Sequence, residues 1–80
     1  MSEDDLVGAA HLWPAMGQLD RDAITYEGHF VCTDEAEGFS RELVIRHVML
    51  DFNLDHNPGE FFTAAAEAVY CPHNDVATTS

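Results

Sequence analysis

The sequence predicts a small α+β domain, in which a β-hairpin or short antiparallel sheet packs against a C-terminal helix and a short N-terminal helix. Three observations lead to this fold class. Residues 23–32 alternate apolar and polar side chains, residues 39–52 form a second apolar run, and residues 57–60 carry a clear helix-start signal. With 80 residues, 46% of them hydrophobic, the chain has enough apolar material for one core. We therefore predict a single domain over residues 1–80.

The N-terminal segment predicts a short helix. Ser2-x-x-Asp5 resembles a capping box, in which each side chain satisfies a backbone N–H of the first turn. Pro14 sets the limit of this helix, because proline does not fit a helix interior. The face turned to the core is expected to contain Leu6, Ala9 and Ala10. Residues 15–22 are then a connection, and residues 1–5 are expected to fray.

The alternating segment 23–32 predicts a half-exposed strand. One face would carry Ile24, Tyr26, Phe30 and Cys32, and the other Thr25, Glu27 and His29. Residues 33–38 are acidic, contain a glycine and are expected to form the hairpin turn.

The run 39–52 fits two structures. As a strand it is apolar on both faces, as in the centre of a sheet. As a helix it places Val44, Ile45 and Val48 in one stripe and Glu42 four residues before Arg46. The strand is preferred, because a strand and a glycine-containing turn precede it.

The C-terminal helix has the clearest local signal. Asn57 is a typical N-cap, and Pro58 and Glu60 suit the first turn. Residues 61–70 follow with high helix propensity, and Pro72 ends the run. The expected core side is Phe61, Phe62, Ala65, Ala66 and Val69. Residues 73–80 are polar and are expected to fray.

The charge of the chain limits its partners. The chain contains no lysine, three arginines and fifteen carboxylates, which gives a formal net charge of −12. Such a chain cannot neutralise phosphates, so direct binding to nucleic acid or to an anionic membrane is excluded. The acidic N-terminus is unlike a signal peptide, and no apolar run is long enough to span a membrane. We therefore expect a cytoplasmic protein with reduced thiols at Cys32 and Cys71.

No motif predicts catalysis or a cofactor. Cys71-Pro72-His73 offers two metal ligands but lacks the paired spacing of a zinc site. The segment that starts at Asp51 opens like a calcium loop, but its sixth position is His56 and its twelfth is Phe62. We predict no enzyme activity, no metal site and no cofactor.

The carboxylates predict a protein partner. A row of them can imitate duplex DNA, which carries one negative charge per about 1.7 Å of axis. We expect an interaction module that inhibits a basic, nucleic-acid-binding protein; the small acidic proteins with which phages block host defences are similar in size and charge. The expected anchor is His29 with Val31. The predicted partner-binding residues are Asp20, Asp22, Glu27, His29, Asp34, Glu35 and Glu37.

Two alternatives remain. The acidity is also what a salt-adapted domain shows, and such a domain could form a homodimer through a strand edge or an apolar helix face. A small metal-dependent regulator built on Cys71 and His73 is the other.

Overall fold

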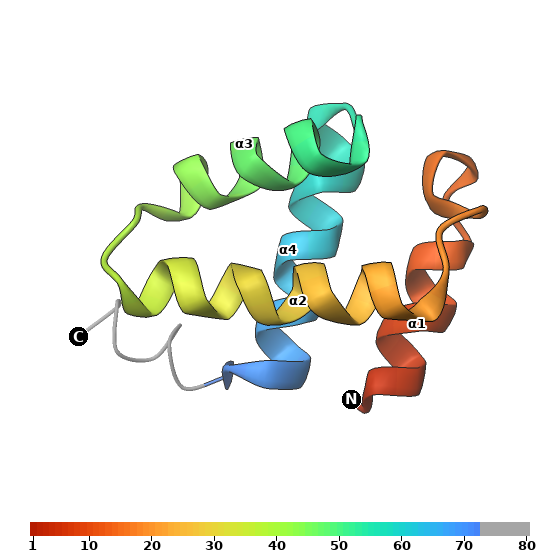
Figure 1. Ribbon diagram of the computed structural model, residues 1–80, viewed down its shortest axis with the longest axis horizontal. Coiled ribbons are helices and arrows are strands. Elements are labelled where there is room, and N and C mark those ends of the chain that lie inside the picture. The colour runs from red at the N-terminus through yellow and green to blue at the C-terminus, as the bar shows by residue number, and fades with distance from the viewer. Residues whose placement is uncertain (73–80) are drawn as a thin grey trace.

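The structure, a computed structural model, describes residues 1–72, and all regular secondary structure in that range is helical. Figure 1 shows the four α-helices, and a short 3₁₀ helix, η1, follows the first of them. Their bounds are α1 Glu3–His11, η1 Pro14–Met16, α2 Arg21–Ala36, α3 Arg41–Phe52 and α4 His56–Tyr70. No strand occurs within residues 1–72, so the predicted α+β fold with its β-hairpin is wrong.

The segment predicted as the first strand lies inside α2. The Asp20 side chain caps this helix, accepting a hydrogen bond from the Ala23 N–H at 2.8 Å. The buried positions Ile24, Gly28 and Val31 have the spacing of a helix face, and this tertiary burial outweighs the β-preference of the threonine and aromatic residues.

The second ambiguous segment is also a helix. Ser40 caps α3 and accepts from the Leu43 N–H at 3.2 Å, while Val44, Ile45 and Val48 are buried. The alternative helical stripe of residues 39–52 is therefore the correct one, and the strand is not. The expected hairpin turn, 33–38, is the last part of α2 and a connection that reverses at Gly38 with φ +98°.

Both terminal helices are confirmed. The capping box of Ser2 and Asp5 is present in both directions at the start of α1, within the five residues expected to fray. The C-terminal helix, α4, begins earlier than predicted, with Asp55 at the N-cap position, so Asn57 and Pro58 lie in its first turn. The predicted tail, 73–80, lies outside the described residues.

The helices pack around one core, with α4 at its centre. In Figure 1, α2 and α3 lie side by side and run in opposite directions, while α4 crosses behind both. Helix α1 packs against α2 and α4. Gly28 of α2 allows α4 to approach closely, because a Cβ there would come 2.6 Å from a ring carbon of Tyr70. The core consists of Leu6, Ala10, Met16, Ile24, Val31, Val44, Val48, Leu54, Phe62, Ala65 and Ala66.

A disulfide joins Cys32 of α2 to Cys71, the residue after α4, with the Cα atoms 5.9 Å apart. The prediction of reduced thiols is therefore wrong. The two cysteines are 39 positions apart in the sequence, so the bond closes a loop that contains α3 and α4. None of the helices in residues 1–72 is long and apolar enough to cross a membrane.

Candidate functional site

The outer side of the α2–α3 pair exposes large apolar side chains. Tyr26 on α2 is 72% exposed and Leu50 on α3 is 74% exposed. Phe39, in the connection between the two helices, is also exposed, and Phe30 and His47 are half-buried. We call Tyr26, Phe30, Phe39, His47 and Leu50 the α2–α3 face.

His47 packs against two aromatic side chains of this face. Its ring centroid lies 5.9 Å from that of Phe39, edge to face, and 6.5 Å from that of Phe30. Tyr26 and Phe30 are one helical turn apart on α2, and His47 and Leu50 are one turn apart on α3, so each pair shares a side of its helix. The face therefore spans both helices.

A carboxyl cluster lies beneath the α2–α3 face. Asp34 is 3% exposed, and its Oδ2 lies 3.1 Å from Nδ1 of His47. Glu27 is 4% exposed, shares a hydrogen bond with Asp51 of α3, and has a second oxygen, Oε2, with no hydrogen-bond partner among the described residues. Burial raises the pKa of Glu27 to about 8, helped by the hydrogen bond and charge of Asp51 and the charge of Asp34. At neutral pH Glu27 therefore keeps its proton.

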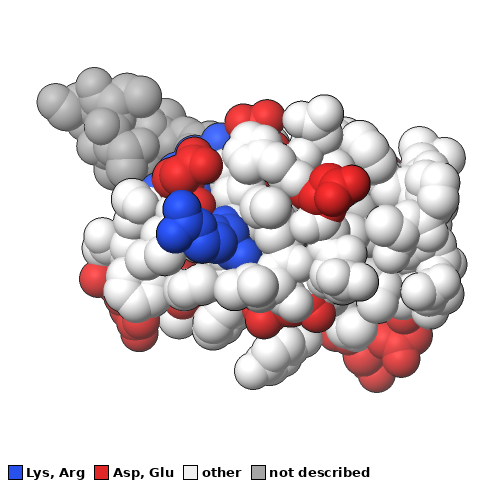
Figure 2. All heavy atoms as spheres, turned by 90° about the horizontal axis from the view of Figure 1, so that it is seen from above, with Lys and Arg blue, Asp and Glu red and all other residues white. Residues whose placement is uncertain are grey.

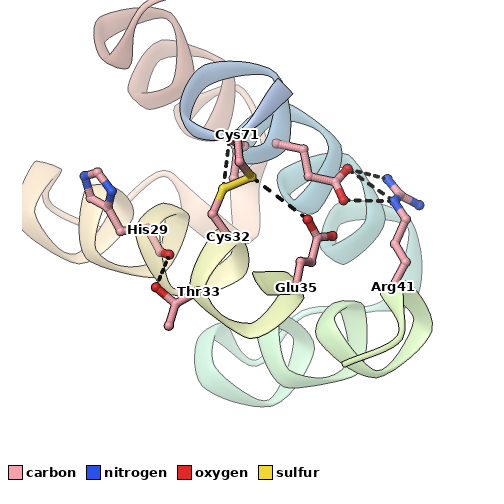
Figure 3. Close-up of a disulfide and its surroundings, with 8 residues drawn as sticks. His29, Cys32, Thr33, Glu35, Arg41 and Cys71 are labelled. Carbon is pink, nitrogen blue, oxygen red and sulfur yellow. Dashed lines mark hydrogen bonds and ion pairs between the residues drawn. A yellow bond between two sulfur atoms is a disulfide. The ribbon is translucent and has the colours of Figure 1, made fainter. Parts of the chain in front are cut away.

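The disulfide lies on another part of the molecule, among polar side chains. Figure 3 shows Glu35 directed at the Cys71 sulfur, which is 3.9 Å from its Oε1, and Arg41 reaching across from α3 to α4. Arg41 binds Glu67, a buried carboxylate of α4. These contacts tie α2, α3 and α4 together, so we assign them a structural role.

A second polar group joins α1, α2 and α4. The Tyr70 hydroxyl donates to Glu3 at 2.6 Å, and the His29 ring stacks on the Tyr70 ring with 3.8 Å between centroids. Burial and the Glu3 carboxylate raise the pKa of Tyr70 to about 12, while the same hydrogen bond lowers the pKa of Glu3. Arg21 of α2 also pairs with Glu3 and with Asp4. These contacts connect α1, α2 and α4 on one side of the bundle.

The structure does not gather the predicted partner-binding residues on one surface. Asp20 and Asp22 lie at the start of α2 and Glu37 just after its end, about 24 Å away for a helix of this length. Glu27 and Asp34 are buried, His29 packs on Tyr70, and Glu35 lies beside the disulfide. Val31, expected to anchor a partner with His29, is 0% exposed and belongs to the core.

Figure 2 shows the α3 side of the molecule, on which the acidic residues are likewise not gathered in one place. Uncharged atoms cover most of this side, the carboxylates form separate groups, and the visible arginine atoms lie next to carboxylates in one half of it. A continuous row of carboxylates is not present on this side. Its dominant feature is the uncharged surface between the acidic groups.

Sequence reasoning missed Tyr26, Phe30, His47 and Asp51 as a set. Tyr26 and Phe30 are four residues apart, as are His47 and Asp51. This spacing places each pair on one side of a helix and also on one face of a strand, so it did not distinguish the two structures; the strand prediction instead paired the wrong residues of the two segments. The wrong secondary structure therefore concealed the site.

No metal site accompanies the cluster. Within residues 1–72 no group of three or more histidine, cysteine or acidic side chains is arranged to hold a metal ion. Cys71 is bonded to Cys32 and so cannot supply a thiolate, and His73 lies outside the described residues. The metal-regulator alternative therefore loses its main ligand.

Comparisons with known proteins place the chain in a family but give no activity. No curated protein and no solved structure matches it significantly. A family model, described as "Protein of unknown function (DUF732)", matches residues 10–73. That range contains α2, α3, α4 and both cysteines of the disulfide. The chain belongs to the DUF732 family.

Proposed function

We propose that this domain is an acidic protein–protein interaction module that binds a basic partner protein through the α2–α3 face. The observation that carries the proposal is the exposure of Tyr26 and Leu50, both above 70%, on one side of a domain with a net charge of −12. Aromatic side chains surrounded by charge are typical of the centre of a protein interface.

The charge distribution supports a basic partner. Arg21 is engaged by Glu3 and Asp4, and Arg41 by Glu67, so two of the three arginines already have acidic partners within the domain. The exposed carboxylates outside these pairs can attract a positively charged surface and speed association. The narrower prediction from the sequence, inhibition of a nucleic-acid-binding protein, requires such a partner in the compartment in which the disulfide persists.

The disulfide indicates the kind of cellular compartment in which the partner is bound. Disulfides persist in oxidising compartments and are rare in the cytoplasm. We therefore propose that the domain works in an oxidising compartment, and not in the cytoplasm as the sequence predicted. Trapping of free thiols in cells that make the protein naturally tests this: an unreactive Cys32–Cys71 pair supports it, and two reactive thiols contradict it.

The binding test uses an amphipathic peptide of alternating arginine and leucine, followed by heteronuclear NMR of the intact protein. We expect shift changes concentrated on α2 and α3. Tyr26→Ser combined with Leu50→Ser should weaken binding at least tenfold, which is about 1.4 kcal/mol. The control is Leu12→Ser, because Leu12 is 83% exposed but lies just after α1. Equal effects of both changes, or shift changes spread over every acidic surface, would mean charge attraction without a binding face.

The salt-adapted alternative is tested by circular dichroism and thermal melts in dilute buffer and in molar KCl. Salt at about 1 M shortens the screening length to about 3 Å and removes most of the repulsion between carboxylates. A domain that is folded in dilute buffer supports a partner-directed charge. A domain that folds only in molar salt would make the acidity an adaptation to the environment.

A further inference from the structure

The unpartnered oxygen of Glu27 is the least satisfied group of the described structure. Its Oε2 is the one buried side-chain oxygen or nitrogen that lacks a hydrogen bond within residues 1–72. The charged groups acting on Glu27 are both carboxylates, Asp51 on α3 and Asp34 on α2, and His47 of α3 is bound to Asp34. No arginine forms an ion pair with the cluster within residues 1–72. The chain contains no lysine, and Arg21 and Arg41 are engaged with other carboxylates.

The surroundings of the cluster suit an arginine side chain. Asp51 is exposed, so a ligand can reach the cluster at this residue. Tyr26 precedes Glu27 and Leu50 precedes Asp51, and both are largely exposed. A guanidinium group pairs with carboxylates through its planar fork and stacks on aromatic rings, while its aliphatic stem packs on leucine. Lysine lacks the fork and stacks less well, so arginine is the better match.

We propose that the carboxyl pair of Glu27 and Asp51, whose chain neighbours Tyr26 and Leu50 are exposed on the α2–α3 face, is a subsite for one arginine side chain of the partner, and that filling it releases a proton from Glu27. This inference rests on the proposed function, whose binding face it makes specific. The guanidinium binds the Asp51 carboxylate and brings one positive charge. The O–H bond of Glu27 then breaks, its proton passes to the solvent, and the Glu27 carboxylate is stabilised by the new cation.

The proposal predicts a pH dependence with a definite sign. Glu27 in the free protein has a pKa raised to about 8 by burial and by its acidic neighbours. Because binding favours the ionised form, affinity should rise with pH, by up to tenfold per unit below about pH 8, and then level off. His47 and Asp34 also face the cluster, so the Glu27 contribution is isolated by substituting Glu27 alone.

The experiment is calorimetric titration of the intact protein with the arginine–leucine peptide at pH 7, in two buffers of different ionisation enthalpy. We expect close to one proton released per bound peptide. Glu27→Gln should abolish the release and flatten the pH profile, and Asp51→Asn should weaken binding at least tenfold. The control is Glu60→Gln, an exposed glutamate of α4, which should change neither quantity. A lysine–leucine peptide should bind more weakly, and equal binding would overturn the assignment to arginine.

The outcomes separate this proposal from the one on which it rests. If the peptide binds the α2–α3 face with no proton release and Asp51→Asn binds equally well, the subsite is wrong and the interaction function stands. If the peptide does not bind the face at all, both fail. Heteronuclear spectra of each variant show that the fold is intact, so a loss of binding cannot be mistaken for unfolding.

Discussion

Arg41 at the start of α3 and Glu67 near the end of α4 form a partly buried ion pair. The Nε of Arg41 lies 3.2 Å from both carboxylate oxygens of Glu67, and its Nη2 lies 3.2 Å from Oε1. The side chain of Glu67 is 2% exposed, whereas that of Arg41 is 42% exposed. The buried carboxylate therefore depends on a single guanidinium that covers it from the solvent side.

Removing this guanidinium should destabilise the domain. We expect Arg41→Met to lower the free energy of unfolding by about 2 kcal/mol, because Glu67 would remain buried without its charged donor. Urea denaturation at pH 7 measures the effect. The control is Arg46→Met, at an exposed position of the same helix, which should change stability by less than about 0.5 kcal/mol. Equal losses in the two variants would contradict a special role for the Arg41–Glu67 pair.

The disulfide should contribute strongly to the stability of so small a domain. Replacing both Cys32 and Cys71 with serine should cost about 2–4 kcal/mol, because the unfolded chain regains the freedom of a loop spanning 39 positions. For a domain of this size that corresponds to a fall in Tm of roughly 10–25 °C. Thermal melts with and without a phosphine reductant measure it. The reductant should lower the Tm of the wild type but not that of the double variant.

Stability should fall as pH rises through the range in which Glu27 differs between the folded and unfolded states. The pKa of Glu27 is 4.5 by ordinary reference and about 8 in the folded domain, so between these values the folded state binds more protons. Each pH unit in this window then lowers the free energy of unfolding by at most about 1.4 kcal/mol. Urea denaturation from pH 4.5 to 9 measures the slope. Glu27→Gln should remove this component and Glu60→Gln should retain it; parallel curves for all three proteins would contradict a protonated Glu27.

Alanine substitutions at two glycines should change the stability of the domain in opposite directions. Gly38 has φ +98°, which strains any residue with a Cβ, so Gly38→Ala should cost about 1 kcal/mol. Gly8 lies inside α1, and a Cβ there would meet nothing within 4 Å. Gly8→Ala should therefore stabilise the domain by about 0.5–1 kcal/mol through helix propensity. Thermal melts of both variants test the pair, and changes of the same sign would contradict the turn geometry.

The local signals at the two ends of the chain were reliable predictors. Ser2 and Asp5 form their capping box through contacts within one helical turn, and proline and glutamate near residue 57 mark a helix start in the same local way. In the middle of the chain the local preferences were misleading. Thr25 and Tyr26 favour strands, but a helix there buries Ile24 and Val31 on the same side. Three further helix signals are present in the sequence at positions predicted otherwise: Asp20 in a connection, Gly38 in the hairpin turn and Ser40 in the second strand.

The sequence by itself determined the net charge of −12 and indicated both terminal helices. The tertiary structure decided the helical middle, the Cys32–Cys71 bond and the cluster of Glu27 with Asp51. These features depend on residues far apart in the chain. Burial against α4 selects helix over strand, bond formation requires two cysteines at one end of the bundle, and desolvation between α2 and α3 protonates a glutamate that looks ordinary in the sequence.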